Sequence, residues 1–464
     1  MDDQDKKPGF LTGGKVTRRE VLKTGVIAAA GLTVLPALIA ACGGSTATPA
    51  PAVKVGSNHS DPSEKKGMDA INAAFATATG VTPTLNTVDH NTFQDQINNY
   101  LGGTPDDVFT WFSGFRMRFF ASKSLATAID DVWSPVAGNY TAGFTGSVTG
   151  NDNHVYGIPV DYYPWCIFYR PSVFTAKNYK VPADWTSFLA LCAQMQKDSL
   201  TPIAFADKDG WPAMGTFDII NLRLNGYDFH VGLMTGAQKW TDPKVTAVFK
   251  AWAQIVPFYT NGYSGLTWQQ ACDTLIQKTA GMYFLGLFLT GEFATVETTV
   301  TDVDFFPWPT MGTSFDAEAA LDAPIDIWMM SAKSPTLQQN MATAKSYLSF
   351  WAKGSTQVLM YKANNGFIPT ANDADASSYD VLTKKAVSIV SSAKKITQFM
   401  DRDTRPDFAG ANGMQTFLQT FLNAPTTDTT ALQAQIQAFW DALPAYNATP
   451  NGTFNPATPT PAAS

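Results

Sequence analysis

The fold is decided by VKVGSNH at Val53–His59 and by DAINAAFATAT, which follows it at Asp69–Thr79. The first segment is a short apolar strand that ends in small polar residues. The second has apolar residues at helix spacing, from Ile71 to Phe75. The alternation continues with strand-like runs at 108–112, 164–169, 282–285 and 325–330, and with helical faces at 92–101, 185–195 and 432–443. Alternation over this length predicts α/β architecture with mostly parallel sheets.

Residues that directly follow these strands are candidates for a binding site, because ligands of such sheets bind beyond the carboxyl ends of the strands. They are Asn58 and His59, Trp111 and Phe112, Phe288, and Trp328. Most of them are aromatic. We therefore expect a site that offers flat rings to its ligand.

The composition disfavours several classes of protein. Charged residues make up 15% of the 464 residues, against about 25% in a typical protein, while aromatic residues make up 12%. The net charge is -7, so no basic face is available to neutralise a nucleic-acid backbone. A disordered chain, a coiled coil and a nucleic-acid binder are disfavoured. Many rings in a chain with few charges suggest a surface that binds something uncharged.

The N-terminal segment has the pattern of an export signal. TRREVLK at Thr17–Lys23 contains a twin arginine, an apolar stretch follows at Val26–Ala41, and Ile39–Cys42 resembles a bacterial lipobox. A single membrane-spanning helix is the alternative, but the apolar run is short and is interrupted by proline and glycine. We expect residues 1–41 to be a twin-arginine-type lipoprotein signal peptide and Cys42 to carry lipid.

Both ends of the exported chain lack the pattern of a folded domain. Residues 42–52 predict a flexible tether and residues 447–464 a disordered tail, since both are rich in Pro, Gly or small polar residues. Three cysteines remain after Cys42, namely Cys166, Cys192 and Cys272. Buried free thiols are favoured over one disulfide. Neither the cysteines nor His90, His154 and His230 have metal-ligand spacing, so we expect no metal and no cofactor.

Several segments, in order, carry a resemblance to a known family. They are GTPDDV at 103–108, VYGIPVDYYPWCIFYRPSVF at 155–174, DWTSFLAL at 184–191, the segment at 280–287, the segment at 325–344 and NGFIPT at 365–370. From about Val53 to Leu443 the chain resembles the extracellular solute-binding proteins of ABC importers, in the sugar-binding family (family 1) that includes maltose-binding protein. One departure is Arg170-Pro171-Ser172 in place of the family's usual Asn-Lys-Asp.

The resemblance implies a two-lobe, periplasmic-binding-protein-like α/β fold of type II, with three crossings between the lobes. Residues 53–161 and 321–364 would form lobe one, and residues 162–310 and 366–443 lobe two. A ligand in the cleft would close the lobes by hinge motion. The resemblance further implies an exported, lipid-anchored monomer that captures a mono- or oligosaccharide, delivers it to a membrane permease and is not an enzyme.

The expected contacts follow from sugar chemistry. Flat rings cover the apolar C–H faces, and charged or amide side chains bond the hydroxyls. By resemblance we place Trp111, Trp211 with Asp209, and Phe288 at the ligand, with a core position as the alternative for Trp111 and Phe288. Further candidates from the crossings, the strands and the charged segment FMDRDTRPDF at 399–408 are Asn58, His59, Asp161, Tyr163, Trp165, Asp326, Trp328, Arg402 and Asp403. The alternative for Asp326 is a buried structural salt bridge, and that for the charged segment is a solvated loop.

Two other functions remain open from the sequence alone. The same fold could bind a polyamine, an anion or iron, although the many aromatic residues disfavour an anion site. An exported glycoside hydrolase would use two carboxylates, but no local catalytic signature is present.

Overall fold

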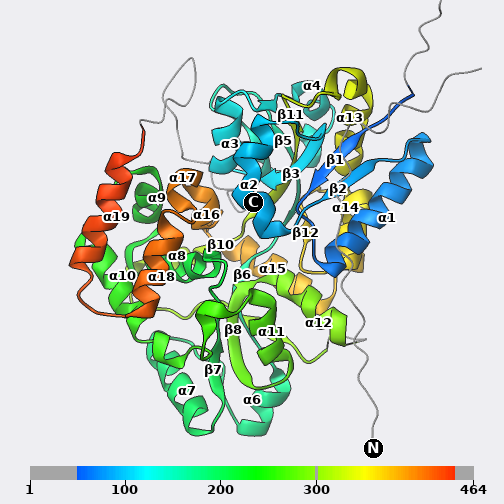
Figure 1. Ribbon diagram of the computed structural model, residues 1–464. Coiled ribbons are helices and arrows are strands. Elements are labelled where there is room, and N and C mark those ends of the chain that lie inside the picture. The colour runs from blue at the N-terminus through cyan, green and yellow to red at the C-terminus, as the bar shows by residue number, and fades with distance from the viewer. Residues whose placement is uncertain (1–49, 298–300, 445–464) are drawn as a thin grey trace, which may run out of the picture. The chain divides into compact units, whose positions relative to one another are not determined.

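The computed structural model describes residues 50–297 and 301–444. The expected signal peptide, Cys42 and the C-terminal tail lie outside these residues, as does most of the tether. Two main sheets carry the fold (Figure 1). In the described part of the chain, no helix combines the length and the apolar character that a membrane span needs.

The first sheet has the strand order β12-β5-β11-β3-β1-β2, with β4 paired to β11. Its strands are β1 (Lys54–Ser57), β2 (Thr84–Thr87), β3 (Val108–Phe112), β4 (Ala126–Thr127), β5 (Gly157–Tyr162), β11 (Ile325–Ser331) and β12 (Ile368–Pro369). The helices before the first crossing are α1 (Pro62–Thr79), α2 (His90–Gly102), α3 (Phe115–Ser122), α4 (Asp130–Trp133) and α5 (Ala142–Val148). Two later helices, α13 (Leu337–Trp351) and α14 (Gly354–Ala363), also pack here, the second against α1.

The second sheet has the order β7-β8-β6-β9, with β6 (Trp165–Tyr169), β7 (Thr201–Ala204), β8 (Ala280–Gly286) and β9 (Asp304–Phe306). Its helices include α6 (Pro171–Lys177), α7 (Trp185–Lys197), α8 (Trp211–Asn225), α9 (Tyr227–Thr235), α10 (Pro243–Ala253), α11 (Trp268–Ile276) and α12 (Thr290–Val296). The C-terminal part adds α15 (Val381–Ser392), α16 (Met400–Asp403), α17 (Pro406–Ala409), α18 (Met414–Asn423) and α19 (Thr430–Ala442). A third pairing joins β10 (Leu321–Asp322) to β13 (Ile396–Thr397).

The predicted α/β class is confirmed, but the expectation of mostly parallel sheets is wrong. β1 runs parallel to β2 and β3, whereas β11 runs antiparallel to β3, β4 and β5, and β12 is antiparallel to β5. The cause is the crossing of the chain. β5 leaves the first sheet at the edge where β1 and β3 end, and β11 enters at that same edge, so β11 must run in the opposite direction. β6 is likewise antiparallel to both of its neighbours.

The strand pairings differ from the expected lobe ranges at two points. Ile368 and Pro369 pair with the edge of the first sheet, although they were assigned to lobe two. Leu321 and Asp322 pair with β13 rather than with the first sheet, although they were assigned to lobe one. The remaining lobe ranges stay a prediction.

Local signals in the sequence account for several helix starts. Asp242 accepts a hydrogen bond from the Lys244 N–H before α10, whose first residue is Pro243. Ser334-Pro335 is a similar pair of residues, but α13 begins only at Leu337. Ser334 instead donates to buried Asp107, which also accepts from the Asn340 side chain at 2.7 Å.

The three cysteines expected to be free are buried and unpaired with one another, as favoured from their number. Burial raises the pKa of the Cys166 thiol to about 12. These thiols therefore pack as small apolar groups in the core.

Candidate functional site

A cavity of about 610 Å³ lies where the first sheet ends and the second begins. From the side of the first sheet it is lined by Asn58 and His59 after β1, Asp61 and Glu64 at the start of α1, His90 and Gln94 in α2, and Pro324 and Asp326 at β11. From the other side it is lined by Trp165, Trp211, Trp268 and Phe288. Tyr163, Phe367, Phe399, Asp401 and Arg402 complete the lining from the connecting segments.

One wall of the cavity is aromatic. The rings of Trp165 and Phe399 are stacked, with centroids 4.9 Å apart and planes 20° apart. Trp211 meets Trp165 edge-on at 6.0 Å, and Phe288 meets Trp268 edge-on at 5.1 Å. The indole nitrogens of Trp165 and Trp211 are buried without a hydrogen-bond partner among the described residues. The wall therefore offers ring surface to the cavity.

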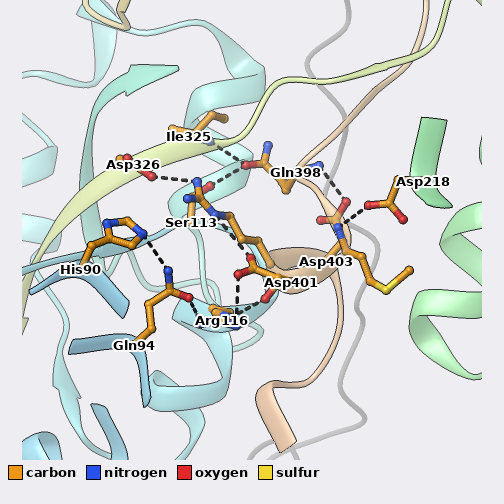
Figure 2. A network of polar contacts seen from close by, with 12 residues as sticks. His90, Gln94, Ser113, Arg116, Asp218, Ile325, Asp326, Gln398, Asp401 and Asp403 are labelled. Atoms are coloured by element: carbon orange, nitrogen blue, oxygen red, sulfur yellow. Dashed lines mark hydrogen bonds and ion pairs between the residues drawn. The ribbon is translucent and has the colours of Figure 1, made fainter. Parts of the chain in front are cut away.

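Phe399 takes this position through a strained backbone. Its φ is 85°, in the left-handed region that side chains other than glycine rarely adopt. Carboxyl groups hold both neighbours: partly buried Asp403 accepts from the Gln398 N–H at 2.7 Å, and buried Asp218 accepts from the Met400 N–H at 2.6 Å (Figure 2). These bonds fix the turn that carries Phe399 into the cavity.

The polar wall is centred on an ion pair. Arg402 Nη1 lies 2.8 Å from Asp326 Oδ1, and the Tyr163 hydroxyl donates to the same carboxylate at 3.3 Å. The guanidinium lies 3.8 Å from the centre of the Phe112 ring, which places a cation over an aromatic face. Burial raises the pKa of Asp326, and the charge of Arg402 opposes that shift.

A second chain of polar contacts leads from Asp401 through Arg116 and Gln94 to His90, as Figure 2 shows, and continues from His90 to Asn58. Arg116 Nη2 lies 3.5 Å from an Asp401 carboxylate oxygen, and Arg116 Nη1 donates to Gln94 Oε1 at 3.2 Å. Gln94 Nε2 is 2.7 Å from His90 Nε2, and His90 Nδ1 is 3.4 Å from the Asn58 side-chain amide. Burial lowers the pKa of His90 to about 3, and the charge of Arg402 adds to the shift.

The remaining acids of the lining, Glu64 and Asp61, each accept a hydrogen bond. Glu64 accepts from the Asp61 N–H at 3.2 Å and lies 3.9 Å from His59. Burial raises the pKa of Glu64 well above its usual value and lowers that of His59 to about 4, so His59 is neutral near pH 7. Asp61 accepts from Gln269 of α11 at 3.2 Å, which joins the two sides of the cavity.

Most of the residues expected from the sequence meet in this cavity. Asn58, His59, Tyr163, Trp165, Trp211, Phe288, Asp326 and Arg402 all line it. Five others do not, namely Trp111, Asp161, Asp209, Trp328 and Asp403. The structure therefore does not support the expected ligand contact for these five residues.

Trp111 and Trp328 are core residues, which corrects their expected stacking role. Trp111 is 1% exposed and packs against Phe93 and Phe120 at 6.1 and 5.5 Å. Trp328 is fully buried and meets Trp351 of α13 at 5.1 Å. Both lie inside strands that are buried on both faces, so neither reaches the sheet edge where the cavity lies.

The three acids among these five residues, Asp161, Asp209 and Asp403, do not line the cavity. Asp161 is 2% exposed, pairs with Asp326 across the strands and has one oxygen without a partner among the described residues. Asp403 is committed to the Gln398 N–H, and Asp209 is half-buried just before α8. Asp403 thus shapes the cavity through Phe399 rather than by contact.

The sequence missed Trp268, Phe367, Phe399 and most of the polar residues that surround Asn58. His90 was not among the expected site residues, yet it lines the cavity at the start of α2. Its place after β2, at the carboxyl end of a parallel strand, was the available signal. Within residues 50–297 and 301–444, no group of three His, Cys, Asp or Glu side chains is placed to hold a metal ion.

Comparison with known proteins gives a consistent result. The family described as bacterial extracellular solute-binding protein matches residues 70–389. An uncharacterized ABC transporter extracellular-binding protein of Pyrococcus horikoshii is 25% identical over 63% of this chain and 65% of its own length. A probable sugar-binding periplasmic protein of Rhizobium meliloti is 22% identical over 52% of this chain and 56% of its own. The chain thus spans less than two thirds of these curated relatives.

Solved structures align over more of the chain. The bacterial solute receptor AcbH, described as having an exclusive substrate preference for β-D-galactopyranose, is 40% identical with a TM-score of 0.81, covering 84% of this chain and 98% of its own. A chitin oligosaccharide binding protein is 19% identical with a TM-score of 0.74, covering 84% and 98%. The second likeness supports the fold alone. Together they confirm the predicted two-lobe fold.

The buried carboxyl groups behind Phe399 predict a pH dependence of stability. Burial raises the pKa of Asp322 and of Asp403 to about 7, above about 3.9 in an unfolded chain. The folded state therefore holds more protons than the unfolded state, and the stabilisation is lost as pH rises through 7. The three histidines with lowered pKa oppose this fall, because an unfolded histidine is still half protonated at pH 6.5, and each adds about 0.4 kcal/mol of stability between pH 6.5 and 8. The free energy of unfolding should fall by about 1 kcal/mol per carboxyl from pH 6.5 to 8.

Urea unfolding at several pH values measures this slope. Asp403→Asn keeps an oxygen acceptor for the Gln398 N–H without a titrating group, so its slope should be shallower. Asp69→Asn, at an exposed position of α1, is the matched control and should keep the wild-type slope. A stability that rises from pH 6.5 to 8, or equal slopes for all three proteins, would contradict the prediction.

Proposed function

The chain belongs to the bacterial extracellular solute-binding protein family, and from that premise we propose that its cavity captures a neutral carbohydrate. The observation that carries the proposal is the division of the lining. One wall presents the rings of Trp165, Trp211 and Phe288, and the opposite wall presents Asn58, His59 and the Arg402–Asp326 pair. Rings suit the C–H faces of a sugar, and directional polar groups suit its hydroxyls.

The charge arrangement favours a neutral ligand over a polyamine. Acids outnumber bases in the lining, but Asp326 is paired with Arg402 and Asp401 with Arg116. Burial raises the pKa of Glu64 well above its usual value, which disfavours its charged form. A polycation would therefore have to displace existing partners, which costs more than binding a neutral group.

A hexopyranose is the specific ligand class that we propose. The similarity to AcbH, at 40% identity over 98% of that chain, supports a single sugar with the galactose configuration. The role of the chain is to close on this sugar and deliver it to an ABC permease, as a receptor without catalytic activity of its own.

Export and lipid anchoring complete the proposal. The twin arginine, the apolar stretch and Cys42 support transport across the cytoplasmic membrane and attachment to its outer face. A single chain would serve as the receptor.

The ligand class is tested by thermal unfolding of the purified protein. D-Galactose, D-glucose, D-xylose, maltose, raffinose, spermidine and phosphate form the panel. A sugar at about 100 times its Kd should add about 2.7 kcal/mol of stability, because only the folded state binds it. Stabilisation by spermidine or phosphate with none by any sugar would reject the carbohydrate proposal.

The aromatic wall is tested at Trp211, the first residue of α8. Trp211→Ala should weaken sugar binding about fivefold or more in calorimetry, because the ring covers a face of the ligand (about 1 kcal/mol). Trp185→Ala is the matched control, since Trp185 is also a partly buried first residue of a helix but stacks on Phe188 away from the cavity. Equal losses of affinity in the two variants would argue against ring contact.

The anchor is tested at Cys42 by growing expressing cells with a clickable palmitate analogue. The wild-type protein should take up the label and fractionate with membranes, whereas Cys42→Ala should do neither. Cys192→Ala removes a buried thiol and should keep the label. Labelling that persists in Cys42→Ala would show that this thiol is not the attachment point.

A further inference from the structure

The polar chain that ends at Asn58 has a fixed direction, and Arg116 sets it. A guanidinium can only donate hydrogen bonds, so the atom of the Gln94 amide that faces Arg116 must be its oxygen. Arg116 is itself buried and is held by the Asp401 carboxylate and backbone carbonyl. The orientation of the Gln94 amide is therefore determined from outside the cavity.

The Gln94 amide in turn fixes the proton of His90. Its nitrogen, which can only donate, lies 2.7 Å from His90 Nε2, so that ring nitrogen must present its lone pair. A neutral imidazole then carries its single proton on Nδ1. The lowered pKa of His90, about 3, keeps the ring neutral at pH 7.

His90 next determines which end of the Asn58 amide meets the ligand. Asn58 Nδ2 is placed 3.4 Å from His90 Nδ1, and two N–H donors do not bond each other. The two ends of an amide have the same shape, so the polar network decides between them. A proton on His90 Nδ1 requires the Asn58 oxygen to face it, which turns the NH₂ group away from the ring. No other hydrogen bond of the Asn58 side chain exists among the described residues, and Asn58 lines the cavity.

We propose that Arg116 is a positioning residue that, through Gln94 and His90, fixes Asn58 as a hydrogen-bond donor to the ligand. The part that concerns the ligand rests on the proposed function. The site then requires an acceptor at this position, such as a hydroxyl or ring oxygen, and rejects an ammonium group. Specificity here comes from the direction of hydrogen bonds rather than from net charge.

The first experiment needs no ligand. Long-range ¹⁵N–¹H spectra of the histidine rings at pH 7 report which nitrogen is protonated, and His90→Asn assigns the signal among the four histidines. His90 should be neutral with its proton on Nδ1. In Gln94→Glu the new carboxylate can accept, so Nε2 should gain a proton. Gln96→Glu makes the same change at an exposed position of α2 and should leave the spectrum as in wild type. A wild-type proton on Nε2, or no change in Gln94→Glu, would overturn the relay.

The second experiment tests Asn58 at the ligand with D-galactose and its 2-, 3-, 4- and 6-deoxyfluoro derivatives. Fluorine can accept weakly but cannot donate, so wild type should tolerate it at the position that Asn58 contacts. Asn58→Asp replaces the donor by an acceptor and should bind that one derivative about tenfold more weakly, relative to galactose, than wild type does. The same fluorine profile in both proteins would remove Asn58 as the donor. If none of these sugars binds, the galactose assignment fails, whereas the relay is still judged by the spectra.

Discussion

The ion pair between Arg402 and Asp326 is the contact on which the cavity depends. Asp326 is the second residue of β11 in the first sheet, while Arg402 belongs to α16, which packs against both α3 and α8. Both groups are buried, so removing either side chain would leave the other charge unpaired and would cost the folded protein several kcal/mol of stability. Asp161 lies across the strands from Asp326 and adds negative charge nearby. The Arg402 guanidinium thus joins α16 to the first sheet. Its positive charge also offsets the negative charges of Asp326 and Asp161, which could not otherwise be buried together.

Contacts of this kind also explain how a ligand could favour a closed arrangement. Asp61 of the first side bonds Gln269 of α11, and Arg116 of α3 bonds Asp401 of α16. A ligand stabilises the closed state only through contacts that it makes there and not in the open state. Asn58 and His59 lie on one side of the cavity and Trp211 and Phe288 on the other, so a molecule between them would touch both.

The sequence predicted the elements better than it predicted the faces they bury. Asn58 and His59 were found because they directly follow a parallel strand. Trp111 and Trp328 were misplaced because β3 and β11 are buried on both faces, so their sequences carry no alternation to tell the cavity from the core. The antiparallel entry of β11 depends on where the chain crosses, which periodicity does not encode. Phe399 was missed because its position follows from a φ of 85° held by distant carboxyl groups.

The polar wall can discriminate among neutral ligands because it selects them by hydrogen bonding rather than by net charge. Asp326 is paired with Arg402 and Asp401 with Arg116, and His59 and His90 are neutral near pH 7, so these groups leave little net charge to attract or repel a ligand. What remains is the arrangement of donors and acceptors, and a mismatched group would leave a buried polar atom without a partner. That cost is about 1–3 kcal/mol for each unsatisfied group, which is comparable with the gain from one stacked ring. A site built in this way gains affinity from its rings and selectivity from its hydrogen bonds, and the second property requires that each amide and each imidazole be held in one orientation by residues outside the cavity.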